Sequence, residues 1–318
     1  VLPHAQKTAK LWVVGPVDSQ KERKMCEFCT EHGEGKKWYL QMKNYAEELL
    51  YEELSASQKE IAKVTTRLEW ANRFWKAFVM PAITGVRQPG VESPDTPLSV
   101  EPGVKPSQDE LITRMKIAHF GQILPIEDVE KVVDMVDSIT RMPCGCRFLT
   151  TGKTDRRYCF GLGIDKWGIL GKFPDAASSL EVLGREEAKK IFHKYDEGGL
   201  MHSIWTGVTP YVIGMCNCDR DCGAYKGYIE MRGAPIFFRA EYICRVNWDL
   251  CSGCKSCMSQ CQFGAQFYSS TLEKVYIDPS RCFGCGVCRA VCPENAIDLI
   301  PRKESPEASN VWLNETSR

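Results

Sequence analysis

The chain has 318 residues, of which 43% are hydrophobic, and its 41 acidic and 41 basic side chains give a formal net charge of zero. This balance removes the simplest argument for nucleic-acid binding, which rests on an excess of Lys and Arg to neutralise phosphates. The length suffices for about two domains with a core of ordinary size.

The first 80 residues contain a short metal-binding pattern. Cys26, Cys29 and His32 are each separated by two residues. This pattern is half of a metal site at best. A metal ion such as zinc would need further ligands here, either from elsewhere in the chain or from a partner chain. These three side chains are therefore possible ligands only.

Residues 38–80 contain no Pro or Gly, and apolar side chains recur near helical spacing. The pattern predicts two amphipathic helices broken near residues 55–57, with Ser57 and Glu60 as a capping box and Pro81 ending the second helix. Residues 81–110 contain six prolines and form a linker or an extended arm. The helices and the arm either dock the chain to a partner or pack on the chain's own domain as a helical hairpin.

Residues 111–241 form a cysteine-rich middle domain. A first helix is predicted over residues 126–141 by the apolar face of Val129, Val132, Val133, Val136 and Ile139. A second helix is predicted over residues 185–196, beginning after Gly184 and ending at Gly198 and Gly199. Cysteines flank both helices, so we expect a metal site built from loops on a small mixed scaffold.

Six cysteines of this domain are candidate metal ligands: Cys144, Cys146, Cys159, Cys216, Cys218 and Cys222. Their C-x-C-R and C-N-C segments resemble those of uncharacterised iron–sulfur proteins in which these segments precede a two-cluster ferredoxin domain. Four thiolates would close one more cubane, and all six would hold a larger cluster; zinc and free redox-active thiols are the alternatives. Basic side chains nearby would offset the charge of a thiolate cluster: Arg147, Lys153, Arg156 and Arg157. We expect His202 to be a core histidine, the alternative being a ligand or proton donor at this site.

Residues 242–301 contain one cysteine pattern twice. Cys251, Cys254, Cys257 and Cys261 have the spacing 2-2-3, and Cys282, Cys285, Cys288 and Cys292 repeat it 31 residues later, followed by Pro293. Two residues between ligands allow one short loop to reach three iron corners of a cubane. The repeat resembles the bacterial two-cluster [4Fe–4S] ferredoxin family. Zinc ribbons also use C-x2-C pairs, but the repeated 2-2-3 spacing and the proline count against zinc.

The resemblance implies how the ligands are shared. In this family the fourth cysteine of each run binds the other cluster. Cluster I would then be held by Cys251, Cys254, Cys257 and Cys292, and cluster II by Cys282, Cys285, Cys288 and Cys261. The resemblance also implies two pseudo-symmetric βαβ-like halves. One position departs from the family, because Gln262 follows Cys261 where proline is usual, and the surroundings of cluster II are expected to differ.

Other functions lack support. The sequence contains no G-x-G-x-x-G after a strand, no P-loop and no pattern of a nucleophile with its base, so dehydrogenase chemistry by this chain alone is unsupported. No apolar run of about 18 residues or more predicts a membrane span, and the N-terminus lacks the apolar core of a signal peptide. Cys244 is expected to be a buried small side chain and not a ligand.

Taken together, the patterns predict an α+β protein: an N-terminal helical arm, the linker, the middle domain, a C-terminal two-cluster ferredoxin domain and a polar tail, residues 302–318. We expect two [4Fe–4S] clusters, with at least one further iron–sulfur cluster or zinc. The expected role is an electron-transfer subunit that relays single electrons among redox partner subunits of a multisubunit oxidoreductase. The alternatives are an iron–sulfur enzyme, whose six-cysteine site is a catalytic cluster fed by the ferredoxin clusters, and a redox-sensing interaction protein. We expect a cytoplasmic protein of anaerobic metabolism, without nucleic acid or a membrane span, although peripheral membrane association is compatible.

Overall fold

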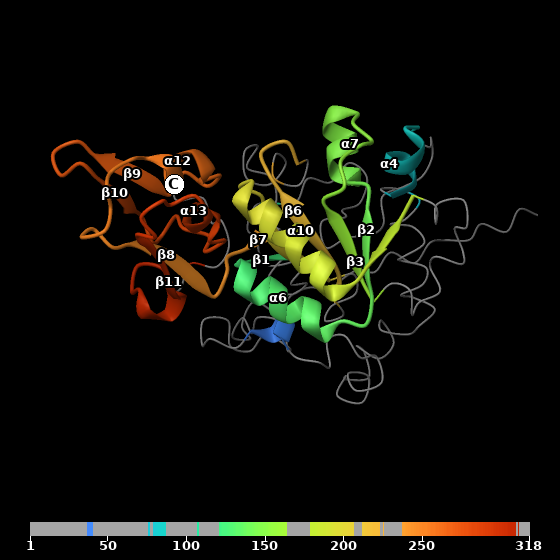
Figure 1. The fold of residues 1–318 in the computed structure, drawn as a ribbon, viewed down its shortest axis with the longest axis horizontal. Coiled ribbons are helices and arrows are strands. Elements are labelled where there is room, and N and C mark those ends of the chain that lie inside the picture. Colours follow the sequence, from blue (N-terminus) through green and yellow to red (C-terminus); the bar gives the residue numbers. More distant parts are fainter. Residues whose placement is uncertain are drawn as a thin grey trace, which may run out of the picture.

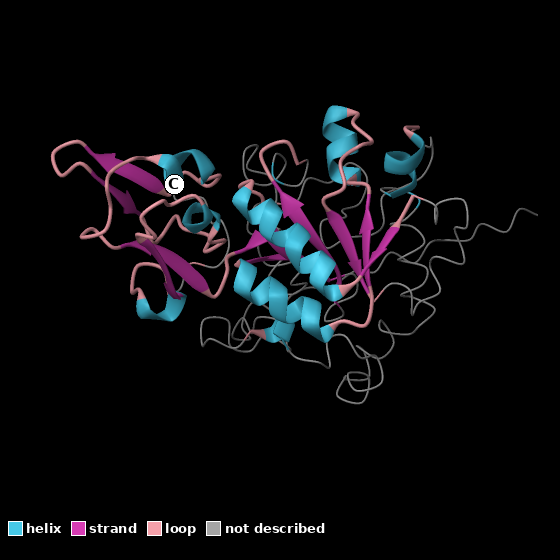
Figure 2. Ribbon diagram, viewed as in Figure 1, coloured by secondary structure: helices cyan, strands magenta, loops and turns pink. Residues whose placement is uncertain are grey.

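The computed structural model describes residues 37–40, 76, 79–86, 107, 121–163, 179–206, 212–222, 225, 237–309 and 311. Within these ranges a large sheet carries two helices across one face, and a small C-terminal unit lies at one end of the sheet (Figures 1 and 2). The candidate ligands Cys26, Cys29 and His32, and most of the predicted N-terminal helices, lie outside the described residues.

The large sheet has seven strands in the order β4-β2-β3-β6-β5-β1-β7. The strands are β1 (Gly121–Leu124), β2 (Ile139–Met142), β3 (Cys159–Leu162), β4 (Glu181–Leu183), β5 (Met201–Thr206), β6 (Val212–Cys218) and β7 (Phe237–Phe238). Neighbouring strands are antiparallel, except that β1 and β7 are parallel. Antiparallel pairing brings β3 and β6 together although about 50 residues separate them in the chain, and this pairing builds one of the sites described below.

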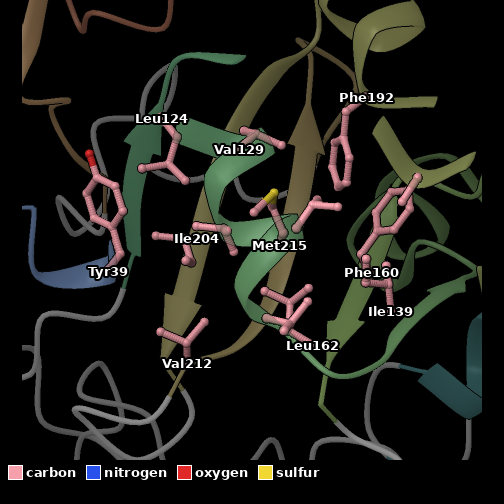
Figure 3. Close-up of a cluster of buried hydrophobic side chains, with 14 of the residues drawn as sticks. Tyr39, Leu124, Val129, Ile139, Phe160, Leu162, Phe192, Ile204, Val212 and Met215 are labelled. Carbon is pink, nitrogen blue, oxygen red and sulfur yellow. The ribbon is translucent and has the colours of Figure 1, made fainter. Parts of the chain in front are cut away.

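Helices α6 (Ile126–Met135) and α10 (Arg185–Glu197) lie side by side over one face of the sheet (Figure 1). Side chains from both helices and from the central strands form the main core, as Figure 3 shows for Val129, Phe192 and Met215. Helix α10 begins after Gly184 and ends before Gly198, as predicted. Gly184 has an extended backbone before the helix, and Gly199, just after it, has the left-handed φ of 78° that is common beyond a helix C-terminus.

Helix α6 is shorter than predicted. It ends at Met135, and Val136 already has an extended backbone, with φ −84° and ψ 149°. The predicted last turn is strand β2 instead, with Ile139 paired to Leu162 of β3 and to Leu183 of β4. The apolar pattern misleads here because Ile139 is buried in the same core whether its backbone is helical or extended.

Two short N-terminal segments are described. The 3₁₀ turn η1 (Trp38–Leu40) packs on α6, and the Tyr39 hydroxyl donates to Asp128 Oδ2 at 2.8 Å. Helix α4 (Met80–Thr84) has Pro81 in its first turn and ends at Gly85 in the left-handed conformation, so Pro81 does not end the helix as predicted. Proline is tolerated in a first turn because the N–H it lacks has no partner there.

The C-terminal unit follows the order β–α–β twice. Its elements are β8 (Tyr242–Val246), α12 (Ser256–Gln260), β9 (Gln266–Ser269), β10 (Lys274–Ile277), α13 (Val287–Ala290) and β11 (Ile297–Pro301), followed by the 3₁₀ turn η6 (Arg302–Glu304). Strand β8 pairs antiparallel with β11, and β9 with β10. Each strand pair therefore joins one strand from each half of the repeat.

The segment after residue 301 also contributes to this unit. Arg302 is fully buried, and its guanidinium donates to the backbone oxygens of Ala240, Tyr242 and Cys282 at 2.7, 2.9 and 2.9 Å. The polar tail predicted for residues 302–318 therefore begins with a structural side chain. Among the helices of the described part of the chain, none has the length and apolar character that crossing a bilayer requires.

Candidate metal centres

The first centre lies in the C-terminal unit. One cavity is lined by three cysteines of the first run and one of the second: Cys251, Cys254, Cys257 and Cys292. The rest of its lining is mixed: Val246, Val275, Ala296 and Ile297 are apolar, and Ser252, Lys255 and Glu294 are polar or charged. Four thiols around one cavity match the donor set of a cubane, and these four are the set that the ferredoxin resemblance implies for cluster I. The residues fit the group.

The second centre gathers the remaining four ferredoxin cysteines. Burial raises the pKa of the Cys285 thiol, and its neighbours Cys282 and Cys261 raise it further. Cys288 likewise faces Cys282 and Cys261. Three members of the second run and the last cysteine of the first are thus close neighbours. This is the set that the resemblance implies for cluster II.

Equivalent hydrogen bonds show the internal symmetry of the two halves. The N–H of Ala265 donates to Cys261 Sγ at 3.3 Å, and the N–H of Ala296 donates to Cys292 Sγ at 3.2 Å. The residue before each alanine has positive φ: 63° at Gly264 and 49° at Asn295. Left-handed backbone at this position turns the next N–H toward the sulfur, and such N–H···S bonds tune the reduction potential of a cluster.

Glycine is required once in each cysteine loop. Gly253 has φ 71° and Gly284 has φ 73°. A Cβ on Gly253 would lie 2.1 Å from Glu273 O, and a Cβ on Gly284 would lie 2.0 Å from Tyr242 O. The loops therefore pass against neighbouring backbone at a distance that only glycine permits.

Cys244 lies beside the second centre. It is buried, as expected for a small core side chain, and its thiol contacts Cys282 and Cys288. Its backbone N–H also donates to Cys282 Sγ at 3.4 Å. The contribution of this N–H was not apparent from the sequence, because it depends on how β8 packs against the second cysteine loop.

The six cysteines of the middle domain also come together, and we call them the six-thiol site: Cys144, Cys146, Cys159, Cys216, Cys218 and Cys222. Cys216 Sγ lies 3.7 Å from Cys159 Sγ, and Cys222 Sγ lies 3.4 Å from Cys218 Sγ. The Cys222 thiol also contacts Cys144 and Cys146, and Cys144 contacts Cys159. These contacts connect all six side chains, although 78 positions separate the first from the last.

Strands and a helix supply most of these thiols, so the predicted loop-built site is wrong. Cys159 on β3 is the direct cross-strand partner of Cys216 on β6. Cys218 lies two residues further along β6 and shares its face with Cys216. Cys144 precedes helix α7 (Gly145–Thr151), and Cys146 lies in the first turn of that helix.

Burial and mutual contact shift the pKa of several thiols in the six-thiol site. Contact with Cys222 and burial raise the pKa of the Cys146 and Cys218 thiols well above the usual range. Contacts with Cys144, Cys146 and Cys218 lower the pKa of Cys222 well below that range. Thiols that are buried together resist losing their protons, and metal ligation offsets this cost because a coordinated thiol is deprotonated.

The thiols are not arranged around one ion. Among the described residues, no group of three or more Cys, His, Asp or Glu side chains is placed to hold a single metal ion. The ferredoxin cysteines share this property, because the ligands of a cubane bind separate iron atoms at its corners. The arrangement therefore gives no support to a preformed zinc site, and a donor set of six thiols is compatible with a cluster of several metal atoms.

Arg147 supplies positive charge at the six-thiol site. Its buried guanidinium lies 3.5 Å from Cys144 Sγ, donates to Asn217 O at 3.3 Å and forms an ion pair with Asp219 Oδ1 at 2.7 Å. It also stacks on the Tyr158 ring, 4.1 Å from the ring centroid. Such a cation offsets the negative charge of a thiolate-bound cluster.

The other predicted cations do not share this role. Arg157 forms an ion pair with Glu181 at 3.1 Å, Arg156 lies 3.6 Å from Asp155, and Lys153 is exposed. Their nearness in sequence to Cys146 and Cys159 misleads, because these side chains are directed to acidic partners or to solvent, whereas Arg147 reaches Cys144 Sγ as well as its acidic partner.

His202 lies on the opposite face of the sheet from the six thiols. It pairs in register with Asn217, whose side chain points away from those of its neighbours Cys216 and Cys218. His202 is fully buried, its Nδ1 lies 2.6 Å from Asn217 Oδ1, and its ring packs edge-on against Phe192 of α10. It is a core histidine, as expected.

Comparison with known proteins identifies the C-terminal unit. Residues 250–296 match the family described as 4Fe-4S dicluster domain. Indolepyruvate oxidoreductase subunit IorA of Thermococcus kodakarensis is 36% identical over 86 residues, which is 26% of this chain and 12% of that protein. The archaeal-type glutamate synthase [NADPH] of Thermotoga maritima is 40% identical over 49 residues, 15% of this chain and 10% of the relative.

A third relative is one of the subunits of the ion-translocating oxidoreductase complex of Methanosarcina acetivorans. It is 40% identical over 57 residues, 18% of this chain and 20% of that protein. The chain thus spans a tenth to a fifth of the length of these relatives. No solved structure matches the chain. The C-terminal unit is a 4Fe-4S dicluster domain, and the first and third of these relatives are oxidoreductase subunits by their names.

Proposed function

We propose that this chain is an electron-transfer subunit that relays single electrons within a multisubunit oxidoreductase. The observation that carries the proposal is the cavity lined by Cys251, Cys254, Cys257 and Cys292, which joins the two cysteine runs at one centre in a domain of the dicluster family. A [4Fe–4S] cluster, when bound, supplies reversible one-electron transfer. The names of two relatives, an oxidoreductase subunit and a subunit of an oxidoreductase complex, support the setting.

The two ferredoxin centres would have different access to partners. Cys254 is exposed, whereas Cys282, Cys285 and Cys288 are buried. A partner protein can therefore approach the first centre closely, while the second is shielded. We assign cluster I to exchange with an external redox partner, and cluster II to transfer within the chain.

The six-thiol site is proposed to hold a further iron–sulfur cluster. Its six connected thiols and the Arg147 cation support this assignment over zinc or free thiols. Relay is favoured over the catalytic alternative because three of the six thiol residues are buried and the other three are only partly exposed, whereas a substrate has to reach a catalytic cluster. His202 also belongs to the opposite face of the sheet, so it provides no proton donor there.

The remaining assignments complete the proposal. Residues 1–80, apart from Trp38–Leu40 which packs on α6, and residues 81–110 would dock the chain to a partner subunit. Residues 111–241, 242–301 and 302–318 would be the middle domain, the ferredoxin domain and its tail. Cys26, Cys29 and His32 are kept as possible ligands of a metal shared with a partner. We place the protein in the cytoplasm, where thiols stay reduced.

The test is the iron and acid-labile sulfide content of anaerobically purified protein, with EPR of the reduced sample. Two cubanes contain about eight irons, so about twelve or more irons per chain are expected if the six-thiol site holds a cluster. The double variant Cys218→Ser, Cys222→Ser should return the content to about eight, and Cys244→Ala serves as the control that keeps every proposed ligand. About eight irons in the unmodified protein would overturn the third cluster, and fewer than that would overturn the relay itself.

A further inference from the structure

The residue that departs from the ferredoxin pattern joins the two metal-binding parts of the chain. Gln262, where proline is usual, donates from Nε2 to Cys218 O at 3.1 Å and to Gly199 O at 2.5 Å. The Tyr225 hydroxyl donates to the backbone oxygen of Gln262. Proline has no side-chain donor, so it cannot make the bond to Cys218. The glutamine thus connects the peptide after a cluster II cysteine to the backbone of a six-thiol cysteine.

A second bond connects the same two segments. Arg220 lies between Cys218 and Cys222, and its Nη2 donates to Cys261 O at 3.1 Å. The loop that carries two thiols of the six-thiol site is therefore bonded to Cys261 through Arg220 and to Gln262 through Cys218. The two contacts cross between segments that are about 40 residues apart in the chain.

The space beside these bonds is apolar. Cys218, Cys222 and Cys285 belong to one buried cluster, to which Phe283 also belongs. The ring of Phe263 stacks on the ring of Phe283, with centroids 3.9 Å apart and an angle of 9° between the planes. Water is excluded from such a contact, so the ring pair adds to the apolar packing that Cys218, Cys222 and Cys285 share.

Cluster I is placed differently. Its ligands Cys251, Cys257 and Cys292 belong to or pack against another apolar cluster, around β8 and β10, which also includes Cys282 and Cys288 of the second centre. Cys254 is exposed. Among the described residues, the apolar cluster next to the six-thiol site contains a cysteine of the second centre and none of the first. Cluster II is therefore the ferredoxin centre next to the six-thiol site.

We propose that the six-thiol site exchanges electrons with cluster II, and not with cluster I, through the link Cys261–Gln262···Cys218, with Gln262 and Arg220 as positioning residues. The inference rests on the proposed function. With both groups bound, the cluster that Cys261 and its three partners would hold would be oxidised by one electron, and the metal centre that the six thiols would hold would be reduced by one. No bond to the protein forms or breaks, and the electron is replaced through cluster I by a reducing redox partner protein.

The experiment uses Gln262→Met, which keeps the length of the side chain and removes its N–H donors. The matched control is Gln260→Met, the same change in a neighbouring glutamine. The Gln260 side chain also lies against Gly199, because a Cβ on that glycine would meet Gln260 Oε1 at 1.8 Å. The full-length protein, with all its metal, is mixed anaerobically with dithionite and frozen after increasing times, and EPR follows each centre.

In the unmodified protein and in Gln260→Met we expect the six-thiol signal to follow the cluster II signal. In Gln262→Met the clusters should be reduced at the unmodified rate, while reduction of the six-thiol centre slows severalfold. The exposed Arg220 gives a second variant pair that does not endanger folding: Arg220→Met should slow the same step, and Arg220→Lys, which retains a donor, should restore part of the rate.

The two proposals fail in different ways. About eight irons per chain would remove the third centre and with it the proposed function of that site. About twelve or more irons, with equal reduction rates in Gln262→Met, Arg220→Met and the unmodified protein, would leave the relay intact and overturn the link. Reduction of the six-thiol centre before cluster II would also overturn it.

Discussion

The close approach at Gly284 gives the sharpest stability prediction. Gly284→Ala places a Cβ 2.0 Å from Tyr242 O, in a residue whose φ is 73°. The left-handed backbone alone costs an alanine about 1–2 kcal/mol. The overlap adds about 1–3 kcal/mol, since the neighbouring atom is backbone and cannot rotate away. The loss of stability should therefore be about 2–5 kcal/mol, a large part of the stability of a small domain.

The surroundings of Tyr242 explain why the structure cannot easily relax. Tyr242 is the first residue of strand β8 and pairs in register with Pro301 of β11. The carbonyl oxygen of Tyr242 accepts a hydrogen bond from Arg302 at 2.9 Å. Moving this carbonyl away from the new methyl group would weaken both contacts. The site thus lacks the flexible side chain that absorbs small overlaps elsewhere.

Gly264→Ala is the matched control in the same domain. Its φ is 63°, and the nearest atom to an added Cβ is Nη2 of Arg281 at 3.2 Å, the mobile end of a side chain. This control should lose only the strain of about 1–2 kcal/mol. The assay is the urea concentration at which the visible absorbance of the clusters is lost under anaerobic conditions. Equal midpoints for Gly284→Ala and Gly264→Ala would refute the argument.

Three further predictions follow from the metal centres. Cys244→Ala should leave the iron content unchanged, because Cys244 contacts Cys282 without being needed as a ligand. Loss of about four irons per chain in metal analysis would show instead that Cys244 is a cluster ligand. Arg147→Met should release metal from the six-thiol site and leave about eight irons per chain. The substitution removes the cation beside Cys144 and leaves Asp219 without its 2.7 Å ion pair. Retention of all iron would contradict this role of Arg147. Removal of iron by a chelator should unfold the ferredoxin domain and spare the seven-stranded sheet, because cysteines form much of the small core of the ferredoxin domain. The far-UV circular dichroism signal should therefore fall only in part. Complete loss of the signal, or no change in it, would contradict the prediction.

Local signals in the chain were sufficient for several features. The two glycine positions around α10 predicted its ends, because each boundary is decided by the residues next to it. The 2-2-3 spacing predicted the cysteine loops for a similar reason, since three ligands within seven residues are held by one stretch of backbone. The end of α6 and the helical role of Pro81 were mispredicted, because an apolar residue or a proline is compatible with more than one local structure.

The sequence by itself determined the candidate thiol ligands, the internal repeat, and the unusual Gln262 at the position where a proline is usual. Only the tertiary structure decided how these parts meet. The register between β3 and β6 brings Cys159 to Cys216, and the register between β5 and β6 pairs His202 with Asn217, whose side chain is on the face opposite Cys216 and Cys218. The bond from Gln262 to Cys218 likewise depends on how two separately folded segments pack. Contacts between distant residues depend on strand register and packing, which no short stretch of sequence specifies.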